Sequence, residues 1–149
     1  MKSTVNFYSL DDVHDINICI CQLVRKLYKT HESVIIIDED NELEKLNKLL
    51  WTFEQNSFLP HKIYENEDKL DTPIILLSEK YIDNENIFDL YSCAINNHSK
   101  PLLQEKNDIN VYEFVVNNEA KKEQSRIKYA EYKRNNYMLK HNKYNEQTI

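Results

Sequence analysis

Two short runs of aliphatic residues constrain the fold more than any other feature of the chain. Residues 33–38 read SVIIID and residues 73–78 read PIILLS, so each run holds four consecutive large aliphatic side chains. A strand with one face in water alternates apolar and polar residues, whereas a parallel strand covered on both faces is apolar throughout. Both runs are far shorter than the ~20 residues that span a bilayer. The sequence therefore predicts two fully buried parallel strands.

The segments around these runs favour an alternation of strands and helices. β-forming residues predict further strands at 4–9, 86–92 and 110–116. Apolar residues at helical spacing predict helices over 12–29, from 39 to 53 and over 119–140. The inward residues expected of the last helix are Ala120, Ile127, Ala130 and Tyr137. In the segment 57–63, Pro60 lacks an amide donor, which favours an edge strand or a loop.

This order of elements indicates one domain of the α/β class. With 149 residues the chain is close to the usual length of a single domain. We expect a largely parallel sheet flanked by helices over residues 1–140, and a frayed tail over residues 141–149. The arrangement is Rossmann-like without a nucleotide-binding loop.

The absence of glycine excludes whole classes of function. Average usage would give about ten glycines in a chain of 149 residues, and this one has none. Loops that cradle phosphates need glycine, because their backbone takes positive φ angles and approaches the phosphate closely. Neither a GxxxxGK[ST] nor a GxGxxG loop can be present, so no nucleotide or other cofactor is expected.

Cysteine and histidine give little support to metal or nucleophilic chemistry. The three cysteines show no disulfide spacing, and no apolar stretch near the first residues resembles a signal peptide, so we expect a cytoplasmic protein without membrane association. The five histidines are scattered without HxxxH or HExxH spacing, so no metal site is expected. Cys93 is open to two interpretations, as a nucleophile or as a buried structural thiol.

Charge divides the chain into an acidic body and a basic C-terminal arm. Residues 1–118 carry 11 basic and 21 acidic side chains, whereas residues 119–149 carry 8 basic and 4 acidic ones. A basic segment can bind nucleic acid or an acidic protein. The acidic body would repel phosphates, but nucleic-acid binding through the basic C-terminal helix stays an alternative.

The acids Asp38, Glu39 and Asp40 directly follow a predicted parallel strand. Enzymes of the α/β class place catalytic groups at this end of their strands. Solvated acids at a helix N-terminus would have the same sequence, because they interact favourably with the helix dipole. A small enzyme that uses Asp38 and Asp40 therefore remains a second alternative.

Two constellations suggest protein interfaces. Trp51 lies on the flank of its predicted helix, and it is followed closely by Phe58, Pro60 and His61. Exposed aromatic residues of this kind mark interfaces, although core packing would also account for them.

The second constellation lies on the last predicted helix. Lys122, Arg126, Tyr129 and Lys133 recur at i, i+4, i+7 and i+11, and so share one face. Arginine binds carboxylates in a bidentate way, and a tyrosine ring supplies an apolar wall. This face suits an acidic peptide with an apolar terminal residue; a merely solvated helix face would show the same pattern.

Three segments carry the most distinctive motifs of the chain: VNFYSL near the start, LLWTFEQNSFLPH at 49–61 and FVVNNEAKKEQSRIKYAEYKRNNYML at 114–139. Together they resemble a known family, the chi subunit of bacterial DNA polymerase III holoenzyme. Their order and spacing match those of the family. The most specific marks are LW followed by SFxPH, and RxxYxxY in the terminal helix.

The resemblance implies an adaptor of the clamp-loader assembly without catalytic activity. Chi-like proteins join the psi subunit, which leads to the clamp loader, to the acidic C-terminal tail of single-stranded DNA-binding protein. It implies a psi-side interface at Trp51, Phe58, Pro60 and His61. It implies a tail-binding site at Val115, Lys122, Arg126 and Tyr129, with Lys133 as an added cation. A helicase is a further candidate partner, and DNA is expected to be contacted only indirectly.

One departure from the family concerns the charge of the tail-binding site. The residue after Tyr129 is basic in familiar members, and here it is Ala130. This removes a cation that Lys128 or Lys133 would have to replace.

Overall fold

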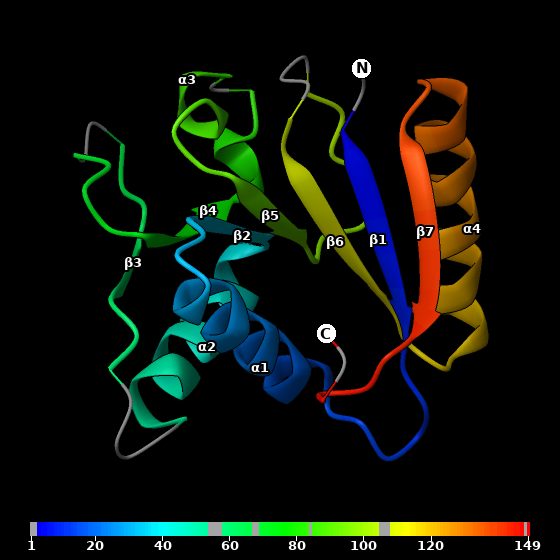
Figure 1. Ribbon diagram of the computed structural model, residues 1–149, viewed down its shortest axis with the longest axis horizontal. Helices are drawn as coiled ribbons and strands as arrows, with labels where there is room; N and C mark the ends of the chain where they lie inside the picture. The colour runs from blue at the N-terminus through cyan, green and yellow to red at the C-terminus, as the bar shows by residue number, and fades with distance from the viewer. Residues whose placement is uncertain (1–2, 54–57, 67–68, 84, 105–107, 148) are drawn as a thin grey trace.

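The computed structural model describes residues 3–53, 58–66, 69–83, 85–104, 108–147 and 149. Strands and helices alternate over most of the chain (Figure 1). The elements are β1 (Thr4–Ser9), α1 (Ile16–Lys29), β2 (Val34–Asp38), α2 (Asp40–Thr52), β3 (His61–Ile63), β4 (Ile74–Ser78), a 3₁₀ turn (Glu79–Tyr81), α3 (Glu85–Phe88), β5 (Cys93–Asn96), β6 (Asn110–Val115), α4 (Glu119–Arg134) and β7 (Met138–Lys143).

The seven strands found among the described residues form one parallel sheet in the order β3-β4-β2-β5-β6-β1-β7. Every residue of β2 and β4 is buried, which confirms that the two aliphatic runs are strands covered on both faces. The α/β class with a parallel sheet flanked by helices is likewise confirmed.

Helices cover both faces of this sheet, and two apolar cores result. Helices α1 and α2 pack on one face, where Ile20, Leu46 and Ile36 belong to one buried cluster. Helices α3 and α4 lie on the other face, where Phe88 and Tyr132 share a second cluster. In Figure 1, α1 and α2 lie close to β2, below it in this view, and α4 runs alongside β7 at the other end of the sheet.

Of the two structures predicted for the Pro60 segment, an edge strand or a loop, the structure has the edge strand. The three-residue strand β3 follows Pro60 directly and, among the described strands, pairs with β4 alone, so it forms one edge of the sheet. Residue 57, the first of the predicted segment, lies outside the described residues.

Helix α1 begins four residues later than the apolar pattern suggested. The carboxylate of Asp15 accepts hydrogen bonds from the amides of Asn17 (2.9 Å) and Ile18 (3.2 Å), and this cap fixes Ile16 as the first helical residue. Val13, which continues the apolar stripe in the sequence, therefore precedes the helix and is 87% exposed.

The prediction of a strand at 86–92 is wrong. Residues Glu85–Phe88 form a single helical turn, and the strand of this region is Cys93–Asn96. Ile87 and Phe88 are adjacent in sequence and both are buried, and a short apolar run of this kind fits a buried helical turn as well as a buried strand. A helical turn directs both side chains into the core beside Tyr91.

The end of the chain also differs from the prediction. Helix α4 ends at Arg134, and Asn136 adopts a positive φ of 64° that turns the chain back. Residues 138–143 then form β7 beside β1, so residues 141–143 are part of the sheet rather than a frayed tail. Tyr144 is buried too, and its amide donates to the carbonyl of Ser9 at 2.9 Å.

The inward face of α4 was only partly predicted. Tyr137, just beyond the helix, is buried as expected. Within the helix the buried residues are Lys128 and Tyr132, whereas Ile127 is 57% exposed. The reason lies in the sheet below, where β6 presents the buried carboxylate of Glu113 to the helix. Ala120 and Ala130 are exposed as well.

Candidate protein-binding sites at the two edges of the sheet

A groove of about 510 Å³ runs between α4 and the end of the sheet that contains β1 and β7. We call it the basic groove. Of the residues expected to bind a peptide tail, it brings together Val115, Lys122, Arg126 and Tyr129. Its other lining residues are Phe7, Ser9, Ser125 and His141. The groove thus combines cations from α4 with apolar, hydroxyl and imidazole groups from β1, β6, β7 and the helix.

Aromatic rings form one wall of the basic groove. The ring of Tyr129 lies 5.4 Å from that of Phe7, centroid to centroid, and remains 41% exposed. A terminal apolar side chain of a peptide could rest on this pair. Beside it, the Ser9 hydroxyl and Nε2 of His141 are 2.6 Å apart, so β1 and β7 are tied together where the groove opens.

Lys122 and Arg126 are the cations that line this groove. Arg126 is well exposed and its guanidinium lies 2.9 Å from Glu123, so an incoming carboxylate would compete with a surface ion pair. Lys133 does not line the groove. Lys128 is buried in an ion pair with Glu113 at 2.8 Å, so it does not replace the cation lost at Ala130.

A buried polar network fixes α4 to the sheet. Three groups donate to the Glu113 carboxylate: the Lys128 ammonium (2.8 Å), the Tyr132 hydroxyl (2.6 Å) and the Asn96 amide (2.7 Å). Burial raises the pKa of Glu113, and the Lys128 ammonium opposes that shift. The Tyr132 hydroxyl also accepts the amide of Leu102 at 2.8 Å. The network sets the position from which Tyr129 and Arg126 project.

At the opposite edge, beside β3, the second set of predicted residues forms an aromatic patch made of Trp51, Phe58 and Pro60 over His61. Trp51 is 55% exposed and Phe58 67% exposed, and their rings lie 5.7 Å apart. His61 differs from the others because it is buried, 4.5 Å below Trp51, with its Nδ1 2.6 Å from the carbonyl of Leu59. It supports the patch rather than forming its outer surface.

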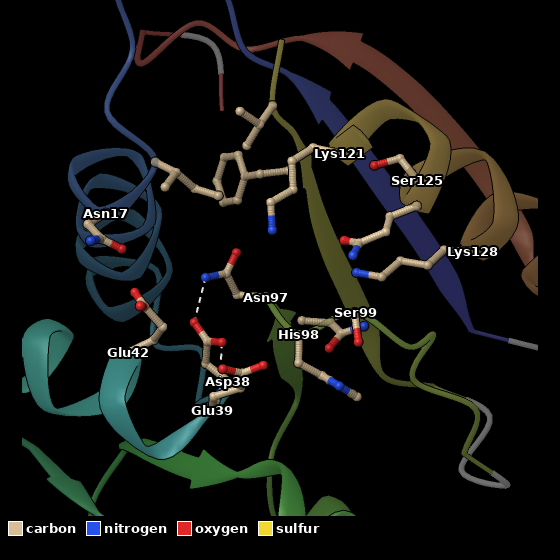
Figure 2. Close-up of a pocket in the computed structure, with 15 residues that line it drawn as sticks. Asn17, Asp38, Glu39, Glu42, Asn97, His98, Ser99, Lys121, Ser125 and Lys128 are labelled. Atoms are coloured by element: carbon tan, nitrogen blue, oxygen red, sulfur yellow. Dashed lines mark hydrogen bonds between the residues drawn. The ribbon is translucent and has the colours of Figure 1, made fainter. Parts of the chain in front are cut away.

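A third candidate site is a polar hollow of about 410 Å³ at the carboxyl ends of β2, β5 and β6. Figure 2 shows Asp38 and Asn97 meeting across it, with Lys121 of α4 extending toward Asn97. The two oxygens of Asp38 accept from the Glu39 amide (2.8 Å) and from the Asn97 side chain (2.6 Å). Asp38 therefore joins the ends of two neighbouring strands.

Asp40 does not share this hollow with Asp38. It lines a separate depression with Ser78 and Lys80, and its carboxylate lies 3.6 Å from the Lys80 ammonium. A hydrogen bond with Ser78 lowers the pKa of Asp40. The structure thus separates the two acids that an enzyme at this strand end would have combined.

Burial raises the pKa of Asp38 from 3.8 to about 6. The folded state therefore holds this proton more tightly than the unfolded chain does. The resulting stabilisation is complete below about pH 4 and is lost as the pH rises to about 6. A shift of this size is worth about 3 kcal/mol at full burial, which solvent in the hollow reduces to about 1–2 kcal/mol.

We predict that Asp38→Asn, which cannot titrate, removes this pH dependence. As the pH rises from about 4 to about 6, the parent should lose about 1–2 kcal/mol of unfolding free energy that the variant does not lose, so the difference between the two should change by this amount in favour of the variant. Urea unfolding of both proteins across this range measures the difference. A difference that stays constant with pH would contradict the assignment to Asp38.

Among the described residues, no group of three or more histidine, cysteine or acidic side chains could hold a metal ion. Cys19, Cys21 and Cys93 are all buried, and burial raises the pKa of Cys19 to about 11. In the described part of the chain, no helix has the length and apolar character needed to cross a membrane.

The sequence matches a known protein family over most of its length. Residues 1–140 match the family described as "DNA polymerase III chi subunit, HolC". The chain belongs to the chi subunit family of DNA polymerase III. The family is part of the DNA replication machinery.

A relative of this chi-family chain is the "Probable DNA polymerase III subunit chi" of Rickettsia prowazekii (strain Madrid E). The two are 28% identical over 98 residues, which is 65% of this chain. The match spans 58% of the length of that relative.

Four lining residues of the basic groove were not foreseen in the sequence. Ser125 lies at i+3 from Lys122 and at i−4 from Tyr129, so helical spacing could have found it. Phe7 and Ser9 are two residues apart and so lie on the same face of β1, but nothing in the sequence indicates that this face contacts α4. His141 was missed because the strand that carries it was not predicted.

Proposed function

We propose that this chi-family chain is a non-catalytic adaptor of the replicative DNA polymerase in the cytoplasm. It joins a psi-like subunit of the clamp-loader assembly to the acidic C-terminal tail of single-stranded DNA-binding protein, and meets DNA only through that protein. The observation that carries the proposal is the position of the two exposed sites. The aromatic patch adjoins β3 and the basic groove adjoins β7, which are the two ends of the strand order, so one partner leaves the other unobstructed.

The chemistry of the basic groove fits the end of an acidic peptide. Arg126 offers a planar guanidinium for a bidentate contact to a terminal carboxylate, and Lys122 adds a second cation. Phe7, Val115 and Tyr129 provide apolar surface for the last side chain. A phosphate-tracking surface would instead need many cations, and the chain as a whole carries a net charge of −6.

The chemistry of the aromatic patch fits a protein partner. Trp51 and Phe58 expose large rings next to one another, and tryptophan is enriched among residues that dominate binding energies. We assign this patch to the psi-like subunit. A helicase that presents a similar apolar surface would compete for it.

We predict that Arg126→Ala weakens binding of the tail about tenfold or more, because a charge-assisted contact to a carboxylate contributes roughly 1.5–3 kcal/mol. Tyr129→Ala should also weaken it by removing the exposed wall. Fluorescence anisotropy with a labelled peptide that carries the tail of the organism's own single-stranded DNA-binding protein measures both effects.

Two variants on the same helix serve as controls. Lys133→Ala removes a cation that lies outside the groove, so the affinity should change less than about twofold. Glu123→Gln frees Arg126 from its surface ion pair and should strengthen binding. An oligonucleotide is titrated in parallel. Tight oligonucleotide binding, together with a tail affinity that Arg126→Ala leaves unchanged, would refute the adaptor role and favour nucleic-acid binding.

A further inference from the structure

The two edges of the sheet differ in how far they are protected from pairing with another chain. The β3 edge has three residues and follows a proline, and both features disfavour added strands. The β7 edge has six residues, Met138–Lys143, and contains no proline. After β7 the chain crosses toward α1, where Arg25 and Glu146 form an ion pair at 2.7 Å, and does not fold back along the edge (Figure 1).

The register of β7 shows which of its backbone groups point outward. The amide of Met138 donates to Ser3 at 3.2 Å, and the amide of Tyr144 donates to Ser9 at 2.9 Å. Alternate residues of a strand direct their backbone groups to the same side, so Met138, Lys140, Asn142 and Tyr144 face β1. Leu139, His141 and Lys143 therefore direct N–H and C=O groups away from the sheet, where no described strand pairs with them.

The charge of β7 favours one kind of partner. The strand carries Lys140 and Lys143, both exposed, and no acidic residue. A second copy of the same edge would bring lysines together, which is unfavourable. An acidic strand would place carboxylates beside them instead. His141 belongs both to this edge and to the lining of the basic groove, so the two surfaces are continuous.

We propose that the outer edge of β7 binds an acidic, extended peptide segment as an additional parallel or antiparallel strand. The occupant is the part of the tail that precedes the terminal residues held in the basic groove, so this inference rests on the proposed function. Backbone hydrogen bonds to Leu139, His141 and Lys143 provide affinity that depends little on sequence, and the lysines select for acidity.

Amide exchange of the full chain tests the proposal with two tail peptides. One has about four residues and reaches only the groove, and the other has about ten, enough to follow a six-residue strand as well. The long peptide should slow exchange of the Leu139, His141 and Lys143 amides about tenfold or more, and the short one should not. The amides of Lys140 and Asn142, already bonded to β1, are the internal reference.

Affinities of the same peptides supply a second readout. The long peptide should bind about fivefold or more tightly than the short one. Lys140→Glu/Lys143→Glu should abolish this gain and leave the short peptide within about twofold. Lys26→Glu/Lys29→Glu makes the same change of net charge on α1, away from the edge, and should preserve the gain. Two versions of the long peptide are N-methylated at alternate residues, one at the odd and one at the even positions. Only one version should bind more weakly, because only one set of alternate amides faces β7.

The outcomes separate this inference from the function on which it rests. If the short peptide does not bind, the proposed function fails. If both peptides bind equally and the edge amides exchange at the same rate, the edge proposal is overturned and the groove remains. Protection of those amides that grows with protein concentration, without peptide, would identify a second copy of this chain as the occupant and also overturn the proposal.

Discussion

Glu113→Ala should lower the free energy of unfolding by about 3–5 kcal/mol, the largest effect that we expect of a single substitution. The variant leaves the Lys128 ammonium without its carboxylate at a position that is only 7% exposed. It also removes the acceptor of the Tyr132 hydroxyl, whose side chain is fully buried. Urea unfolding at neutral pH, compared with the parent, measures the loss.

A double substitution distinguishes the cost of an unpaired charge from the loss of packing. Glu113→Leu/Lys128→Met replaces the ion pair with apolar side chains of similar size. Its free energy of unfolding should be equal to or higher than that of the parent. Lys128→Met alone leaves the carboxylate with its other two donors, so it should cost less than Glu113→Ala. A loss below about 1 kcal/mol for Glu113→Ala would show that the pair contributes little.

This network explains why the protein places a buried charge in its core. Helix α4 has few apolar side chains, so its attachment to the sheet relies on Glu113, Lys128 and Tyr132. Hydrogen bonds have defined directions, whereas apolar packing permits rotation of the helix about its axis. The network therefore specifies which face of α4 turns outward, and with it the position of Arg126 and Tyr129 over Phe7.

The parts of the fold that the sequence predicted are those where hydrophobicity alone decides. The aliphatic runs at β2 and β4 are covered on both faces, as expected of short, continuously apolar strands in a parallel sheet. The α/β class follows from those runs and from the stripe of α1. Pro60 limited its segment to an edge strand or a loop, because a missing amide donor cannot be placed inside a sheet, and the structure has the edge strand.

The parts that were not predicted depend on contacts between distant segments. The sequence of β7, MLKHNK, has no apolar alternation, because most of its side chains are exposed and its stability comes from backbone pairing with β1. The buried face of α4 was misassigned because two polar residues occupy it, opposite an acid 15 residues away in the chain. Neither fact is visible in a local window of sequence.

The same limit applies to the sites. Arg126 and Tyr129 could be grouped because they share one helix face. That Lys128 is buried, and Lys133 outside the groove, depends on the rotation of α4 against β6. Likewise, Trp51 and Phe58 were grouped by proximity in sequence, but the burial of His61 beneath them follows from its position in β3.

Phe58→Ala should weaken binding of a psi-like subunit by at least about 2 kcal/mol, close to thirtyfold, while the protein stays folded. The ring is 67% exposed, so its removal leaves the core intact, but it takes away the surface that extends Trp51 outward. Trp51→Ala should have an effect of similar size, and the double variant should lose less than the sum, because the rings act together. Titration calorimetry with the clamp-loader assembly of the same organism measures the affinities, and thermal unfolding checks the fold.

Leu90→Ala serves as the control, because it removes an apolar side chain of comparable exposure elsewhere on the surface, and it should bind the psi-like subunit as tightly as the parent does. The aromatic patch is not the partner site if Phe58→Ala binds like the parent, and Phe58 is a core residue if the variant loses its unfolding transition. Tail binding at the basic groove should be unchanged in all of these variants, because the two sites lie at opposite edges of the sheet.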